Sequence, residues 1–240
     1  MAAINYPIYI LFGLAPSIIW LLFFLRKDSH PESNSMILKI FFFGMLAALP
    51  VAMLEIGFYE QLKSLGFPIF LSRIIYVFLG IAFIEEIFKY LVVKRWVKKD
   101  SELDEPVDIM LYMIIAALGF AASENLLILF PLLNPFQFFE TAVVSMFRFV
   151  GATFLHALTS GLIGYFMVLS FLEAKNHSKL AKGLFTATAL HGLYNFSIME
   201  VGGSFKFLIP IFILISLAVF LSLGFDKVKK LASICKLNKK

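Results

Sequence analysis

Long apolar runs alternate with short polar segments along the whole chain, and each run is long enough to cross a bilayer. A membrane-spanning helix needs about 20 apolar residues, and the hydrocarbon core has no water to satisfy an open backbone, so each run predicts a helix. Seven runs are present, at 7–25, 40–57, 67–93, 107–133, 142–172, 180–199 and 207–225. The pattern predicts an all-α fold: residues 1–240 form one integral membrane domain, a polytopic bundle of about seven transmembrane helices.

Composition excludes most other classes of protein. Of the 240 residues, 60% are hydrophobic and 15% are charged, and the mean hydropathy is +0.89. So large an apolar excess cannot be buried inside a soluble particle of this size, because too little of the chain lies in its interior. A soluble enzyme and a disordered chain are therefore excluded. Cys235 is the only cysteine, which excludes a disulfide-stapled domain and a zinc ribbon of cysteine pairs.

Basic residues gather in alternate loops and indicate the orientation of the chain. One set of loops and tails carries fifteen lysines and arginines, whereas the opposite set carries only Lys63 and Lys206. Since basic loops stay in the cytoplasm, we expect a multi-pass plasma-membrane protein with its N-terminus outside and its C-terminus in the cytoplasm. The net charge of +5 forms no solvated basic face, so we expect the lipid bilayer, and no nucleic acid, as a partner.

Several ionisable residues lie inside the predicted spans, and each needs an explanation. An ionisable side chain near the bilayer centre costs on the order of 2.5–3.5 kcal/mol by insertion scales. Arg73 and Arg148 lie near the outer interface, where snorkelling or pairing explains them. The remaining six lie deeper, on four consecutive spans: Glu85, Glu86, Lys89, Glu124, His156 and His191.

The third span carries two adjacent carboxylates and one lysine. Glu85 and Lys89 are four residues apart, so they share a helix face and can form an ion pair, whereas Glu86 points about 100° away from Glu85. Two carboxylates beside one lysine leave excess negative charge in a medium of low dielectric constant. A proton, a histidine or a metal ion would have to compensate it.

The histidines complete a set of groups suited to hydrolysis. His156 and His191 lie on the fifth and sixth spans, and a polar residue follows each after one turn, Ser160 and Asn195. Separated glutamates and histidines can activate a water molecule, either directly or on a metal ion. Because this set is buried in lipid, we expect its substrate to be in the membrane too, and the sequence predicts an intramembrane protease.

Other interpretations can be tested against the same residues. All five aspartates lie in loops or at helix ends, which excludes an aspartyl dyad, and no HExxH zinc motif occurs. A dyad of Ser160 and His191 is conceivable, but it would leave the glutamates without a role. A proton-coupled transporter that uses the same acids and histidines as a relay stays open, as does a membrane scaffold without turnover.

The motifs, taken in order, resemble those of the PrsW family of intramembrane proteases, which is related to the CAAX-protease and bacteriocin-processing group. The resemblance covers about residues 67–200. It rests on the following residues: Glu85, Glu86 and Lys89, then Asp104, Glu105 and Asp108, then Gly119, Phe120, Glu124 and Asn125, then Arg148, His156, Ser160 and Gly161, and finally His191, Tyr194 and Asn195. Where CAAX proteases have phenylalanine four residues before the first histidine, this chain has Ala152, which favours PrsW.

The resemblance implies roles for individual residues and a class of substrate. By analogy with the CAAX proteases, Glu85 and His156 activate the water, and His191 and Asn195 stabilise the oxyanion. The doubled catalytic glutamate of the family corresponds to Glu85 and Glu86, and Lys89 holds Glu86 or Glu85 in place. Glu124 and Asn125 support the site. The implied substrate is a membrane-anchored protein of the anti-sigma-factor kind. Two mechanisms stay open: one without a cofactor, and one in which Glu85, Glu86, His156 and His191 bind a divalent metal ion such as zinc.

The acidic residues ahead of the fourth span also have a purely structural explanation. Asp104, Glu105 and Asp108 surround Pro106 at the start of the predicted helix. Acidic side chains in this position satisfy free backbone N–H groups and the helix dipole, and proline is favoured in the first turn. We therefore expect these residues to cap the helix.

Overall fold

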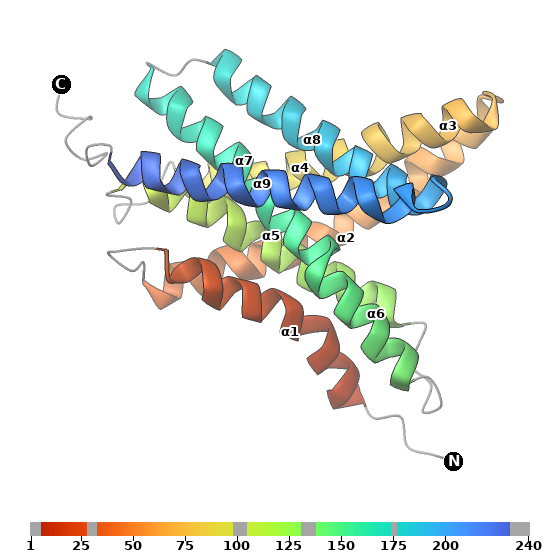
Figure 1. Ribbon diagram of the computed structural model, residues 1–240, viewed down its shortest axis with the longest axis horizontal. Helices are drawn as coiled ribbons and strands as arrows, with labels where there is room; N and C mark the ends of the chain where they lie inside the picture. Colours follow the sequence, from red (N-terminus) through yellow and green to blue (C-terminus); the bar gives the residue numbers. More distant parts are fainter. Residues whose placement is uncertain (1–5, 28–32, 98–104, 131–137, 174–176, 231–240) are drawn as a thin grey trace.

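The protein is a bundle of long helices in a computed structural model that describes residues 6–27, 33–97, 105–130, 138–173 and 177–230 (Figure 1). The described residues contain helices and turns but no strand. The elements are α1 (Tyr6–Leu25), α2 (Asn34–Ser64), α3 (Ile69–Ile75), the π-helix η1 (Tyr76–Phe83), α4 (Ile84–Val97), α5 (Pro106–Leu129), α6 (Phe138–Val150), α7 (Ala152–Leu172), α8 (His177–Glu200) and α9 (Phe205–Lys229).

These elements form seven helical segments, one for each predicted span, because α3, η1 and α4 follow one another directly and α6 leads into α7. Among the described residues, five segments are long and apolar enough to cross a membrane: α1, α2, α5, Phe139–Leu172 and α9. The other two segments carry Glu85 and Glu86, and His191. The all-helical membrane bundle is therefore confirmed, and its two most polar segments are the ones that bring these side chains into the interior.

Helix α5 is the centre of the bundle. It packs against α1, α2, α4 and α7, and almost all of its side chains are buried. Its contact with α2 is close, because a side chain on Gly119 would lie against the Phe41 carbonyl group, and one on Gly44 would lie against the Ala116 carbonyl group. Small residues allow helix backbones to approach in this way. Glu124 on α5 is thereby held at a fixed depth relative to its neighbours.

The third segment differs from the regular helix that was expected. Between α3 and α4 the backbone forms the π-helix Tyr76–Phe83, which ends two residues before Glu85. This wider helix packs against α2 and α8. A side chain on Gly80 would meet the rings of Phe58 and Tyr76, so the glycine allows the close approach of α2. π-Helical turns occur frequently at functional sites.

The fifth segment also differs, because it begins earlier than predicted and is broken. Helix α6 ends at Val150 and α7 begins at Ala152, with Gly151 between them at φ −106° and ψ −93°. A side chain on Gly151 would lie against the Tyr194 hydroxyl and the Phe147 carbonyl oxygen. Packing of α8 against the break therefore requires glycine there, and α6 can leave the axis of α7 (Figure 1).

Two further expectations concern helix ends. Helix α2 is longer than the predicted span at 40–57, since Ser33 caps its start by accepting a hydrogen bond from the Met36 N–H, at 3.3 Å. The acidic residues before α5 cap that helix as expected: the Asp108 side chain accepts from the Glu105 N–H at 2.8 Å. Asp104 and the last residues of the predicted span 107–133 lie outside the described residues.

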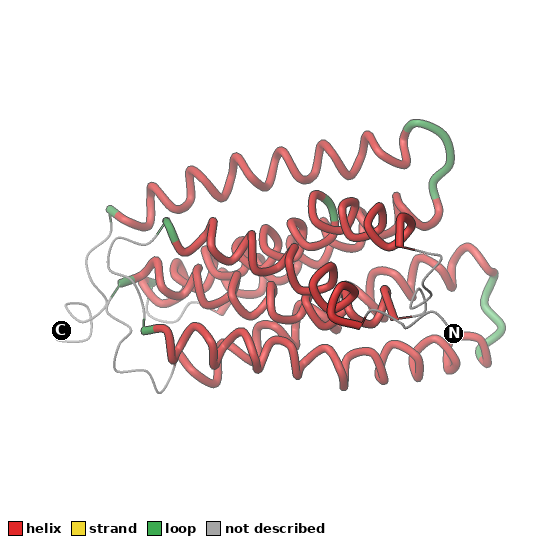
Figure 2. Tube along the Cα trace, turned by 90° about the horizontal axis from the view of Figure 1, so that it is seen from below, coloured by secondary structure: helices red, strands yellow, loops and turns green. Residues whose placement is uncertain are grey.

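The bundle is elongated, and its helices run between two ends (Figure 2). Helices α1 and α9 both finish at the same end, where Arg26, Lys27, Lys227 and Lys229 lie (Figure 1). The basic residues of the first and last spans are thus neighbours in space, as the charge pattern requires.

Candidate active site

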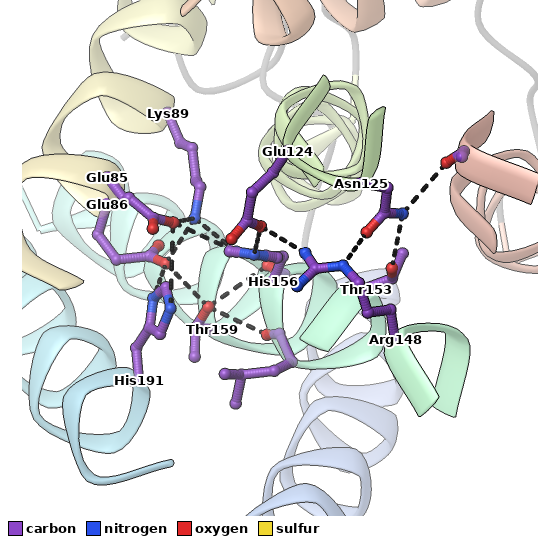
Figure 3. A network of polar contacts seen from close by, with 12 residues as sticks. Glu85, Glu86, Lys89, Glu124, Asn125, Arg148, Thr153, His156, Thr159 and His191 are labelled. Atoms are coloured by element: carbon purple, nitrogen blue, oxygen red, sulfur yellow. Dashed lines mark hydrogen bonds and ion pairs between the residues drawn. The ribbon is translucent and has the colours of Figure 1, made fainter. Parts of the chain in front are cut away.

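The six deeply placed ionisable residues come together in one buried network (Figure 3). Helix α4 contributes Glu85, Glu86 and Lys89, α5 contributes Glu124, α7 contributes His156 and α8 contributes His191. The exposed fraction is 3% for Glu85, 2% for His156 and 1% for His191, and Glu86 and Lys89 are fully buried. Residues far apart in the sequence therefore form one buried polar cluster inside an apolar bundle.

Lys89 contacts the two glutamates of its own helix and also His156 on α7. Its Nζ lies 3.0 Å from Glu85 Oε2, 3.0 Å from Glu86 Oε1 and 2.8 Å from His156 Nδ1. The first two contacts follow from helical spacing, since residues three and four positions apart lie on one face. An ammonium group has three N–H donors, so each has one acceptor here. Lys89 was expected to hold Glu86 or Glu85, and in the structure it contacts both.

The two glutamates have different surroundings. Glu86 accepts hydrogen bonds from Lys89, from the Ser160 hydroxyl at 3.1 Å and from His191 Nδ1 at 2.9 Å, and the Thr159 hydroxyl lies 3.1 Å away. Both of its oxygens are therefore occupied. Glu85, by contrast, uses only Oε2 in its contacts with described residues. Glu85 is thus the carboxylate with an oxygen left for a reacting molecule.

Each histidine has a carboxylate at one nitrogen and turns the other nitrogen toward Glu85. His156 Nε2 lies 2.8 Å from Glu124 Oε2, and its Nδ1 lies 3.6 Å from Glu85 Oε2. His191 Nδ1 contacts Glu86, and its Nε2 lies 4.0 Å from Glu85 Oε2. The carboxylate fixes which nitrogen of a neutral ring holds the proton. We therefore assign the proton of each ring to the nitrogen facing its carboxylate, which leaves a lone pair toward Glu85.

A second set of contacts supports Glu124 from the opposite side. Arg148 Nη2 lies 2.8 Å from Glu124 Oε2, and Arg148 Nε donates to the Asn125 side-chain oxygen. The Asn125 amide in turn donates to the Gly13 carbonyl and to Thr153 Oγ1, both at 3.2 Å. Arg148 therefore pairs with an acid inside the bundle, one of the two explanations that the sequence left open.

Two other predicted residues lie differently. Asn195 is partly buried on α8, one turn after His191, and its side chain forms no hydrogen bond with another residue in the described part of the chain. Its role at an oxyanion stays a prediction. The Ser160 hydroxyl donates to Glu86, and among the described residues no hydrogen bond joins it to His191. This arrangement does not support a serine–histidine dyad.

Sequence reasoning missed Glu55. It lies on α2 inside the predicted second span, is partly buried, and interacts electrostatically with Glu85, Glu124 and Lys89. The signal was available, because a carboxylate inside an apolar run is as unusual there as at Glu124. A fourth acidic residue, on a fifth helix, therefore interacts electrostatically with the network.

The chain matches the family model described as PrsW family intramembrane metalloprotease over residues 32–223. The chain belongs to this family. It is 33% identical to Protease PrsW of Geobacillus kaustophilus over 189 residues, which cover 78% of each protein. It is 27% identical to Protease PrsW of Oceanobacillus iheyensis over 208 residues, 85% of this chain and 88% of that protein. It is 29% identical to Protease PrsW of Bacillus subtilis over 226 residues, 92% of this chain and 94% of that protein.

No solved structure matches the chain. The PrsW family resemblance seen in the motifs is confirmed, and the protein is an intramembrane protease. The family description includes a metal ion, so the donor groups of this chain can be compared with what such an ion needs.

The donor set of this PrsW family member suits a divalent metal ion. One ligand atom each from Glu85, His156 and His191 lies within 4.8 Å of the others. Catalytic zinc sites use three protein ligands of these types, and a carboxylate commonly supports the far nitrogen of each histidine ligand. Here Glu124 supports His156 and Glu86 supports His191. Glu86, also predicted as a ligand, is not part of this group, and its Oε1 lies 2.9 Å from His191 Nδ1.

Proposed function

We propose that this PrsW family protease hydrolyses a peptide bond of a membrane-anchored protein with a water molecule activated beside Glu85. The observation that carries the proposal is the convergence of Glu85, His156 and His191 from three helices, with ligand atoms within 4.8 Å of one another. Glu85 Oε2 lies 3.6 Å from His156 Nδ1 and 4.0 Å from His191 Nε2, so one oxygen and two ring nitrogens lie close together. Such an arrangement can hold and deprotonate one water molecule.

The protein groups divide the proton transfers among them. Glu85 takes a proton from the water, helped by His156, while the water oxygen bonds to the carbonyl carbon. The proton then passes to the leaving nitrogen as the C–N bond breaks, so atoms and charge balance. Hydrogen-bond donors stabilise an oxyanion, so Asn195 would act through its amide N–H. His191 would act in the same way only with a proton on Nε2 as well as on Nδ1.

The same residues would hold a metal ion. Glu85, His156 and His191 would be its ligands, Glu86 and Glu124 would orient the two rings, and Lys89 would stay with Glu86. A bound zinc ion would supply Lewis-acid activation of the carbonyl group and the water. Of the two mechanisms left open by the sequence, this geometry supports the metal-dependent one, because both histidines have a carboxylate behind them.

The substrate that suits this site is a single-span membrane protein of the anti-sigma-factor kind, which is what the family resemblance implies. We place the protein in the plasma membrane as one unit of 240 residues, with the N-terminus outside and the C-terminus in the cytoplasm. The support for this orientation is the shared position of the basic ends of α1 and α9 (Figure 1).

Reconstitution with a tagged single-span substrate tests the proposal. We expect Glu85→Gln to lower the cleavage rate about 100-fold or more, since positioned acid–base groups contribute on the order of 10²–10⁴-fold. Glu60→Gln is the matched control, because Glu60 is exposed and forms an ion pair with the exposed Lys63. Full cleavage by a folded Glu85→Gln variant would contradict the proposal.

A further inference from the structure

The ammonium group of Lys89 contacts ligand atoms that a metal ion would also need. It is fully buried and contacts Glu85 Oε2 at 3.0 Å and His156 Nδ1 at 2.8 Å. These two atoms belong to two of the three residues that can converge on a metal ion. The ring of Phe120 covers Nζ from another side, with its centroid 4.6 Å away.

His156 cannot bind Lys89 and a metal ion at the same time, and flipping its ring does not remove the conflict. The lone pair on Nδ1 can accept from Lys89 or bind a metal ion, but it cannot do both. The other ring nitrogen contacts Glu124 at 2.8 Å, and Glu124 is itself paired with Arg148. A ring flip would therefore break the carboxylate support on which ligand orientation depends.

Charge adds to the conflict over this lone pair. Like charges repel strongly in a medium of low dielectric constant, and a divalent ion repels an ammonium group twice as strongly as a monovalent ion at the same distance. We propose that Lys89 competes with a divalent metal ion for Glu85 and His156, so that metal binding requires the ammonium group to withdraw from both. The inference rests on the metal-dependent form of the proposed function and concerns how that site is loaded.

Glu55 gives the displaced ammonium group an acceptor. Lys89 can keep its contact with Glu86, but it loses two of its three acceptors when a metal ion binds. Glu55 is partly buried on α2, which packs against α4, and it interacts electrostatically with Lys89. Pairing stabilises a buried charge, so we assign Glu55 as an acceptor for the withdrawn ammonium group.

Zinc binding to the purified full-length protein, measured without substrate by competition with a chromophoric chelator, tests the competition. We expect Lys89→Met to bind zinc at least about tenfold more tightly than the wild type, because it removes the competing charge. Lys63→Met, on an exposed lysine, is the matched control and should leave the affinity unchanged. Equal or weaker binding by Lys89→Met, or no zinc binding by either protein, would overturn the inference.

Melting temperatures and the charge-conserving variant Lys89→Arg distinguish an effect on zinc binding from a folding defect. Lys89→Met leaves Glu85 and Glu86 without their cation, so its metal-free form should melt at a lower temperature, and zinc should raise that temperature by more than in the wild type. Lys89→Arg keeps the charge and should show no gain in zinc affinity. If Lys89→Arg gains affinity as Lys89→Met does, charge competition is wrong.

A double-mutant cycle tests the role of Glu55. We expect Glu55→Gln to weaken zinc binding several-fold when Lys89 is present, because the displaced ammonium group then lacks an acceptor. In the Lys89→Met background the same change should have little effect. An equal loss in both backgrounds would overturn the assignment of Glu55 as the acceptor. Zinc affinity is measured without proteolysis. A wild-type protein that cleaves no substrate but shows these zinc affinities would contradict the proposed function, and the competition between Lys89 and the metal ion would still stand.

Discussion

His191 Nδ1 lies 2.9 Å from Glu86 Oε1, and both side chains are buried. This contact separates the roles of two glutamates that are neighbours in the sequence. Glu86 fixes the ring of His191 and is held by α7 through Ser160, whereas Glu85 faces the lone pairs of both histidines. The doubled glutamate therefore contains one acid placed to react and one placed to orient.

We expect Glu86→Gln to lower the cleavage rate about 10- to 100-fold, which is the usual effect of removing a group that orients a metal-binding or reactive histidine. The amide has only one acceptor oxygen and cannot satisfy Lys89, Ser160 and His191 together. Initial cleavage rates at equal amounts of folded protein measure the effect. Gln61→Glu, an isosteric change of the opposite kind in an exposed turn of α2, should leave the rate unchanged. A wild-type rate for Glu86→Gln would remove the distinction between the two acids.

Arg148 acts on His156 through Glu124. We expect Arg148→Ala to lower the cleavage rate about tenfold, because Glu124 then loses the cation that holds it beside the ring. Arg148→Lys restores the charge without the hydrogen bond to Asn125 and should recover part of the rate. Arg73→Ala removes an exposed ion pair with Glu200 and serves as the control. Equal rates for all three variants would show that the ion pair is only structural.

The close approach of α2 and α5 depends on glycine. Gly119→Ala places a methyl group against the Phe41 carbonyl, so the helices must separate, and we expect a loss of about 1–3 kcal/mol of stability. Gly57→Ala lies in the same bundle with nothing within 4 Å and should be neutral or slightly stabilising, because alanine favours helix. Melting temperatures in detergent compare the two. A larger loss for Gly57→Ala would contradict the packing argument.

The orientation can be measured with reporter fusions. Alkaline phosphatase is active only outside the cytoplasm, so we expect a fusion after Lys240 to be inactive and a fusion in the turn at Gly202 and Gly203 to be active. A green fluorescent protein should give the reverse pattern. Opposite results at both positions would mean that the bundle is inverted in the membrane.

Much of the fold follows from the sequence, because lipid imposes simple rules. An apolar run of membrane length has to be a helix, so seven segments could be predicted. A charged group inside such a run is costly, so the deep glutamates and histidines could be recognised as one network before their contacts were known. Figure 3 shows these side chains together, and with them Thr153 and Thr159, which the prediction did not include.

The pairing within the network could not be predicted in the same way. Which acid faces which histidine depends on helix rotation, and the π-helix before Glu85 changes that rotation. The break at Gly151 depends on the approach of Tyr194 from α8, a contact between residues far apart in the chain. Glu55 was missed because it lies near the end of the predicted second span at 40–57, although the helix continues to Ser64.

The π-helix Tyr76–Phe83 has a consequence for changes in chain length. It accommodates more residues per turn than an α-helix, and it lies directly before the two acids. Loss of one residue from an α-helix that stays α-helical turns everything after it by about 100°. In this stretch the loss can be absorbed instead, because a wide π-helical turn that tightens into an α-helical one needs one residue fewer. Glu85 and Glu86 would then keep their neighbours although the chain had become shorter. Deletions of the same size in α4 and in the π-helix should therefore differ in their effect on the site.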